Sequence, residues 1–202
     1  MTDMERAEYT DKIILALRTK YQEKRTEHLP VEKEIILRGK KIALNREILF
    51  EGKCSILLPE IMVDMDYPNR VIRYRNSNRP QIIKTDYKSG ATMTFSLLPM
   101  TEMIEAKSIS EQMKIIRSDI MKVWKQNVFY DQGEISEDGE PIVWMDFRAY
   151  CMDGSLYTIL FMFQVEEQIV LGNFHCSFPQ YDIWKSVVIK LLTTVQKGGT
   201  QK

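Results

Sequence analysis

The sequence contains few histidines and cysteines, the residue types that commonly serve as nucleophiles, bases and metal ligands. Its 202 residues include two histidines, His28 and His175, and three cysteines, Cys54, Cys151 and Cys176. The odd number and wide spacing of the cysteines fit neither a disulfide framework nor a paired-cysteine metal site. We therefore expect reduced and mostly buried thiols, with no metal ion and no cofactor.

The chain also lacks an excess of charge and a long apolar run. Lysine plus arginine (28) equals aspartate plus glutamate (28), so there is no net positive charge to favour nucleic acid or anionic lipid. No segment approaches the roughly 18 or more apolar residues of a membrane span, and residues 1–12 lack the apolar core of a signal peptide. We expect a cytoplasmic protein without a membrane span that does not bind nucleic acid.

Motifs of common enzyme classes are absent as well. The chain contains no GxGxxG, Walker A, HExxH or GxSxG pattern. His175 and Cys176 are adjacent, but neighbouring residues of a strand point to opposite faces, so they do not form a nucleophile and base pair. These observations predict that the protein is not an enzyme.

The first 46 residues predict an N-terminal extension. Thr2 and Glu5 have the spacing of a capping box, and apolar residues recur at helical spacing up to about Lys24. The segments EIILRG and KKIALNRE then predict two short strands around Gly39. The apolar stripe of this helix must pack on the rest of the chain, on a partner or on a second copy, so a homodimer is one expected assembly.

Residues 47–202 predict a single α+β domain in which helices flank an antiparallel sheet. Ser108 and Glu111 form a second capping-box pattern, and one face of the helix after it is marked by Ile109, Met113, Ile116, Ile120 and Trp124. In the strand SLYTILFMFQV the alternating residues from Tyr157 to Val165 share one face, and the opposite face is also fairly apolar. This pattern predicts a central strand or one whose second face is covered. Strands are expected over residues 47–59, 81–85, 91–98, 128–135, 141–151, 155–165 and 168–178, and helices over 109–126 and 181–196.

One segment concentrates positive charge between aromatic residues. Pro68 discourages a long helix here. The basic residues are interleaved with Tyr67, Tyr74 and Tyr87, and they are Arg70, Arg73, Arg75, Arg79, Lys84 and Lys88. Arginines beside aromatic rings can bind phosphate, nucleic acid or an acidic peptide. The alternative is a charged loop that keeps the edge of the sheet soluble. These four arginines are the candidate ligand-binding residues.

Other charged residues are better explained as solvated or locally paired groups than as catalytic or metal-binding residues. A glycosidase or a calcium site needs carboxylates that converge, and the acidic residues around the turn SEDGE have no such spacing. We expect a solvated hairpin turn containing Asp131, Glu134, Glu137, Asp138 and Glu140. Asp146 and Arg148 lie two apart on one strand face, which predicts a local ion pair or a polar sheet face.

The segment ILFEGKCSILLPE, residues 48–60, resembles the opening strands of the Mog/PsbP-like superfamily. The order of elements after it is similar too: a hairpin ending in TFSLL, a helix, antiparallel strands with DG turns, and a last helix introduced by Trp184. The resemblance covers about residues 47–196. It implies an α+β fold shared with photosystem accessory proteins, Ran-binding import factors and bacterial DcrB-like proteins, some of which resemble chaperones.

Two functional hypotheses follow. The first is a non-enzymatic protein-binding, adaptor or chaperone-like protein, which the resemblance implies because none of those groups is a conventional enzyme family. The alternative is a small anionic-ligand binder or an enzyme with a site around Arg70 to Arg79. An open sheet face would favour the first hypothesis, whereas a deep pocket in which arginines meet carboxylates would favour the second.

Overall fold

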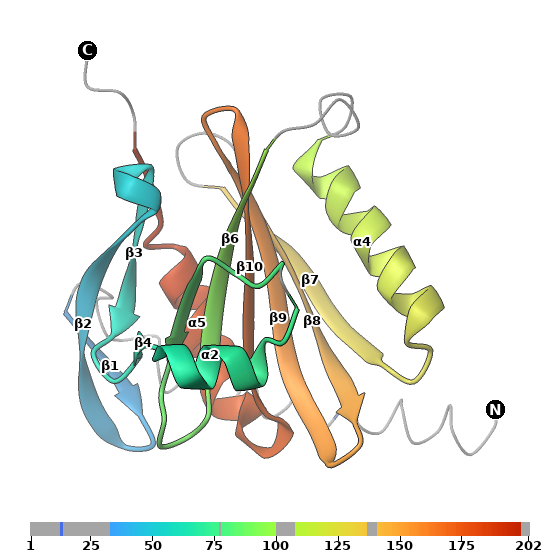
Figure 1. The fold of residues 1–202 in the computed structure, drawn as a ribbon, viewed down its shortest axis with the longest axis horizontal. Helices are drawn as coiled ribbons and strands as arrows, with labels where there is room; N and C mark the ends of the chain where they lie inside the picture. Colours follow the sequence, from blue (N-terminus) through green and yellow to red (C-terminus); the bar gives the residue numbers. More distant parts are fainter. Residues whose placement is uncertain (1–12, 14–32, 77, 100–107, 137–140, 199–202) are drawn as a thin grey trace.

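The computed structural model describes residue 13 and residues 33–76, 78–99, 108–136 and 141–198, and these form an α+β protein (Figure 1). The first half contains β1 (Glu34–Leu37), β2 (Lys40–Leu49), η1 (Phe50–Gly52), β3 (Cys54–Pro59), β4 (Val63–Asp64), α2 (Tyr67–Arg73), β5 (Ile82–Thr85) and β6 (Thr92–Pro99). The second contains α4 (Ile109–Val123), β7 (Val128–Ile135), β8 (Ile142–Cys151), β9 (Gly154–Val165), β10 (Gln168–Ser177), η2 (Phe178–Gln180), α5 (Tyr181–Leu192) and β11 (Gln196–Lys197). The helix predicted between residues 2 and 24 falls almost entirely outside the described residues.

The strands form two antiparallel sheets. The larger has seven strands in the order β4-β5-β6-β10-β9-β8-β7, and the smaller has four in the order β1-β2-β3-β11. Figure 1 shows α5 behind the larger sheet, the smaller sheet beside it, and α2 and α4 in front. We call the face that packs on α5 and the smaller sheet the inner face, and the face beneath α2 and α4 the outer face.

The main hydrophobic core lies on the inner face. The alternating side chains of β9 that were predicted to share one face, from Tyr157 to Val165, are all buried in this core. Trp184 and Leu191 of α5 pack against them. Full burial of each large apolar side chain contributes about 1.5–3 kcal/mol, so β9 and α5 provide much of the stabilisation. The prediction of a central strand is confirmed.

A second core lies on the outer face beneath α4. Ser108 and Glu111 form the predicted capping box, and Ile109 and Met113 pack on the outer residues of β8 and β9. The helix ends at Val123 rather than near residue 126. Trp124 was predicted to continue the buried stripe, and this is wrong: its backbone leaves the helical conformation (φ −119°, ψ 72°) and its side chain is 50% exposed.

The strand pair predicted around Gly39 is confirmed and belongs to the smaller sheet. Strand β2 runs without a break from Lys40 to Leu49 and pairs with both β1 and β3. The boundary predicted between residues 46 and 47 therefore falls inside this strand. Leu44 and Leu49 join the main core together with β9 and α5.

Gly172 of β10 provides a test of packing on the inner face. A Cβ atom at this position would lie 2.0 Å from the ring of Phe161, which is fully buried and has no room to move. We expect Gly172→Ala to lower the free energy of unfolding by about 1–3 kcal/mol in urea titrations. Gly133→Ala should lower the free energy of unfolding by less, because its new Cβ atom would contact the half-buried ring of Trp144 at the sheet edge. Equal costs would contradict this account.

Candidate functional site

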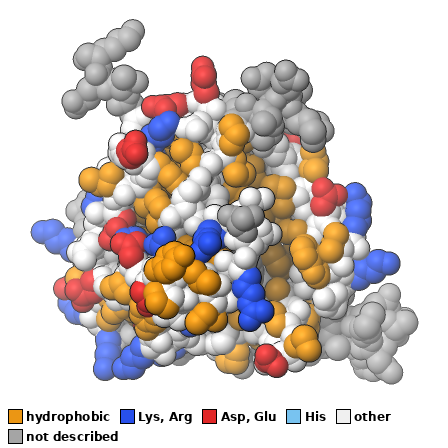
Figure 2. Space-filling model, viewed as in Figure 1, with side chains coloured by type: hydrophobic (Ala, Val, Ile, Leu, Met, Phe, Trp, Pro, Cys, Tyr) orange, Lys and Arg blue, Asp and Glu red, His pale blue; other side chains and the backbone are white. Residues whose placement is uncertain are grey.

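The outer face of the larger sheet is hollowed between α2 and α4, as Figure 2 shows. We call this region the outer groove. The strand register gives its floor as two rows that run across β6, β10 and β9. One row contains Thr94, Asn173 and Leu160, and the other contains Thr92, His175 and Thr158.

The two sides of the floor differ in polarity. Toward α4 the rows continue into Met145 and Phe147 of β8, which are buried in the second core. Toward α2 the rows contain threonine, asparagine and histidine side chains, and Thr92, Thr94 and Thr158 are almost fully buried, so the folded chain itself covers much of this polar side. The outer groove thus has one apolar side and one polar side.

Asn173 has an unsatisfied acceptor in this floor. Its side-chain Oδ1 is buried and has no hydrogen-bond partner in the structure, although its backbone oxygen accepts a hydrogen bond from Thr94 Oγ1 (3.3 Å). A buried acceptor without a partner costs about 1–3 kcal/mol, so a water molecule or another donor is expected to bind this atom.

His175 lies two residues along the same strand and on the same face as Asn173. Burial, and to a smaller extent the positive charge of Arg73, lowers its pKa to about 4, so the ring is neutral at pH 7. Cys176 points into the main core, where burial raises the pKa of its thiol well above the usual range. The predicted divergence of His175 and Cys176 is confirmed.

Helix α2 forms the wall of the outer groove on the polar side. Asp66 caps it by accepting a hydrogen bond from the Asn69 backbone N–H (2.9 Å), and Pro68 occupies its first turn. The helix has seven residues and none of them is buried. It is therefore held mainly by its cap and by the polar contacts of its neighbours.

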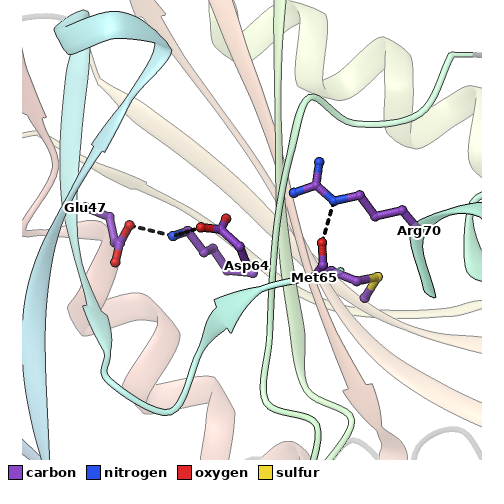
Figure 3. Close-up of polar contacts among 5 residues, drawn as sticks. Glu47, Asp64, Met65 and Arg70 are labelled. Carbon is purple, nitrogen blue, oxygen red and sulfur yellow. Dashed lines mark hydrogen bonds and ion pairs between the residues drawn. The ribbon is translucent and has the colours of Figure 1, made fainter. Parts of the chain in front are cut away.

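The four predicted arginines occupy different positions. The Nε of Arg70 donates to the backbone oxygen of Met65 (2.7 Å), which holds the start of α2 against the sheet (Figure 3). Arg73, at the end of α2, is exposed and close enough to His175 to influence its charge state. Arg75 and Arg79 are exposed in the segment that follows. The structure thus gives Arg70 a local structural contact and leaves Arg73, Arg75 and Arg79 exposed to solvent.

Lys84, which the sequence analysis counted in the basic segment, is instead buried and joins the two sheets. Lys84 of β5 lies 2.6 Å from a carboxylate oxygen of Glu47 on β2 and 3.2 Å from one of Asp64 on β4 (Figure 3). Burial lowers the pKa of Lys84, but the two carboxylates outweigh burial and raise it. A lone lysine inside the apolar strand QIIKT was the available signal.

A second buried network links α5 to the sheet on the inner face. Lys185 lies 2.6 Å from an oxygen of Asp131 and 2.8 Å from one of Asp146. Tyr157 donates to Asp146 (2.6 Å), and burial together with the Asp146 charge raises the pKa of Tyr157 well above its usual value. These groups pack in the main core rather than in the outer groove, so we interpret them as structural.

This network corrects the expectation of an Asp146–Arg148 ion pair. Asp146 is fully buried and pairs with Lys185, whereas Arg148 donates to Ser155 (2.9 Å) and lies over the ring of Phe178. Asp131 of the predicted solvated turn lies on β7, where its side chain is 66% exposed and pairs with Lys185, whereas Glu137, Asp138 and Glu140 lie outside the described residues. Periodicity cannot reveal such pairs, because they join residues that are far apart in the sequence.

A cavity of about 260 Å³ lies between α4 and the edge of the larger sheet. Its lining includes Lys114, Gln132, Glu134 and Trp144, and none of the four predicted arginines. Across the described ranges, no group of three or more histidine, cysteine, aspartate or glutamate side chains could hold a metal ion. Nor does any helix in those ranges have the length and apolarity needed to cross a membrane.

His175 should make stability depend on pH. Its pKa is about 4 in the folded protein and near 6.5 when unfolded, so the unfolded chain binds more protons between these values. Stability should therefore fall as the pH drops from 6.5 to 4, with a contribution of roughly 2–3 kcal/mol from this group. His175→Gln should reduce that loss in urea titrations across the range, and an unchanged loss would contradict the assignment.

Lys185 should be essential to the inner network. Replacement by Met leaves the buried carboxylate of Asp146 without its cation, so we expect Lys185→Met to cost about 3–5 kcal/mol of unfolding free energy. Lys122→Met, which breaks the exposed Lys122–Asp119 pair, should change stability by less than about 1 kcal/mol. Similar losses of unfolding free energy from the two substitutions would show that the buried ion pair contributes no more to stability than the exposed one.

Comparison with known proteins identifies the fold of the chain but not its family. No protein-family model matches the chain, and no curated protein sequence matches it. The solution structure of PsbP (CyanoP) from Synechocystis sp. PCC 6803 is similar over 85% of this chain and 96% of that protein, with 9% identity and a TM-score of 0.58. A Pseudomonas aeruginosa protein of unknown function, PA94, described as a putative regulator, is similar over 78% of this chain and 99% of that protein, with 10% identity and a TM-score of 0.46. The antiparallel sheets and flanking helices therefore have the PsbP-like α+β fold.

Proposed function

We propose that this chain is a non-enzymatic protein-binding protein, of adaptor or chaperone type, that holds a segment of its partner in the outer groove. The observation that carries the proposal is the exposure of apolar side chains on both helices beside the groove. Ile72 of α2 is 65% exposed and Val123 of α4 is 66% exposed. Clusters of exposed apolar residues commonly mark interaction sites.

The composition of α2 strengthens this proposal. Single exposed apolar residues are common and need no explanation. In α2, however, Tyr67, Val71 and Ile72 are all exposed, and the helix contributes no buried residue to the core. Figure 2 shows the resulting apolar cluster over α2, beside the hollow. A partner that covers this cluster would bury surface that the folded chain leaves in water.

The alternative is a small anionic-ligand binder or an enzyme around Arg70 to Arg79. It has less support because Arg70 bonds to the backbone and the described cavity contains none of these arginines. The fold does not decide between the two, since one fold can serve many functions. A relationship to bacterial DcrB-like proteins and a cytoplasmic location remain parts of the proposal.

Partner capture from the native organism, compared across matched variants, tests the proposal. Ile72→Glu and Val123→Glu place a charge on the exposed surface of α2 and of α4 and should reduce the recovered partner by about tenfold or more. Ile48→Glu is the control, because Ile48 is 72% exposed on β2, in the smaller sheet. Light scattering of the same proteins identifies the case in which the partner is a second copy.

Equal recovery by all four proteins would contradict binding in the outer groove. So would selective loss with Ile48→Glu, because that result would move the binding surface to the smaller sheet.

A further inference from the structure

We propose that the last turn of α4 and the hairpin between β8 and β9 form a docking surface for an anionic lipid membrane. Trp124 and Met152 insert between the lipid headgroups, and Lys122 and Lys125 bind the headgroup phosphates. This inference goes beyond the proposed function and shares one side chain with it, that of Val123. It follows from the exposure and the charge of this end of the molecule.

The last turn of α4 projects from the protein. The buried residues of this helix all lie in its first two turns, whereas every residue from Met121 to Gln126 is exposed. Met121, Val123 and Trp124 are large and apolar, and each is more than two-fifths exposed. Several large apolar side chains gathered on one exposed turn indicate a site of interaction rather than of packing.

The hairpin between β8 and β9 lies beside this turn. The backbone N–H of Tyr150 donates to Oδ1 of Asn127 (3.3 Å), and the backbone N–H of Asn127 donates to the Trp124 backbone oxygen (3.0 Å). Two residues after Tyr150, the tip of the hairpin carries Met152, which is fully exposed. Figure 1 shows the end of α4 and this hairpin at the same end of the molecule. The two turns thus present Trp124 and Met152 side by side on a convex surface.

Positive charge surrounds the exposed turn, although the whole chain is neutral. Residues 114–127 contain four basic residues and one acidic residue. The acidic one, Asp119, already pairs with Lys122 (3.0 Å). In the hairpin, Arg148 and Asp153 cancel in charge, so the hairpin leaves this excess unchanged. Basic residues that accompany exposed apolar residues are attracted to anionic headgroups.

The residue types suit a lipid interface better than a protein partner. A protein would need a matched pocket for each of the two projecting turns, whereas a fluid headgroup layer accepts projecting side chains without matched shape. Tryptophan combines an apolar ring with a polar N–H, which favours the boundary between headgroups and acyl chains. Lys122 and Lys125 flank Val123 and Trp124 in the sequence, so their stems can follow the apolar surface while the ammonium groups stay among the headgroups.

Vesicle co-sedimentation of the full-length protein tests the inference. The probes are vesicles of phosphatidylcholine alone and vesicles that also contain about 30% of the anionic lipid phosphatidylglycerol. We expect the anionic vesicles to bind at least about tenfold more tightly, and less tightly as salt is added. Trp124→Ala should weaken binding by about tenfold, and the double change of Lys122 and Lys125 to Gln should remove the preference for anionic vesicles. Ile48→Ala, at an exposed position of β2, is the control and should bind like the unchanged protein.

Tryptophan fluorescence gives a readout confined to the proposed surface. Trp184 is fully buried and Trp144 is half-buried, so Trp124 is the most exposed of the three tryptophans. Brominated lipids quench a tryptophan that enters the lipid layer. We expect anionic vesicles with brominated phosphatidylcholine to quench part of the emission. Trp124→Phe, which keeps an aromatic ring at this position, should still bind the vesicles but should lose the quenching.

Other outcomes contradict the inference. They are no binding to anionic vesicles, equal binding to both kinds of vesicle, binding that survives Trp124→Ala, and quenching that survives Trp124→Phe. If vesicles do not bind and Trp124→Ala reduces capture of the native protein partner, this end of the molecule belongs to the protein interface. The membrane inference would then be wrong and the proposed function would stand. Circular dichroism of each variant confirms that it is folded.

Discussion

The burial of β9 on both faces is the constraint on which the rest of the structure depends. Its inner residues require the cover that α5 and the smaller sheet provide, and its outer residues Leu160 and Met162 require α4. Helix α4 covers the outer face over β8 and β9, which leaves the polar floor of β10 and β6 beside it. The outer groove is therefore a consequence of how much of a doubly buried sheet one helix can cover.

The sequence predicted most helices and strands because their signals are local. The capping box at Ser108 and the alternation from Tyr157 to Val165 are read from neighbouring residues, and both are confirmed. The groove was not predictable in this way. It depends on β10 lying between β6 and β9, which brings Thr94, His175 and Thr158 together from three separate strands. The buried pairs of Lys84 and Lys185 escaped prediction for the same reason.

The predicted arginine segment is best understood as one wall of a larger surface. Arg70 fixes α2 through the Met65 backbone oxygen, and Arg73 is exposed at the end of the same helix. The sequence identified the charge of this segment but not its neighbours, which come from β10.

Hydrogen–deuterium exchange on the chain with its captured partner tests the central claim most directly. If a partner segment occupies the outer groove, amide exchange should slow in α2, in the second half of α4 and in the loops that border them. Exchange in β1, β2 and β3 should remain unchanged. Protection confined to the smaller sheet, or no protection of α2 and α4, would contradict the account.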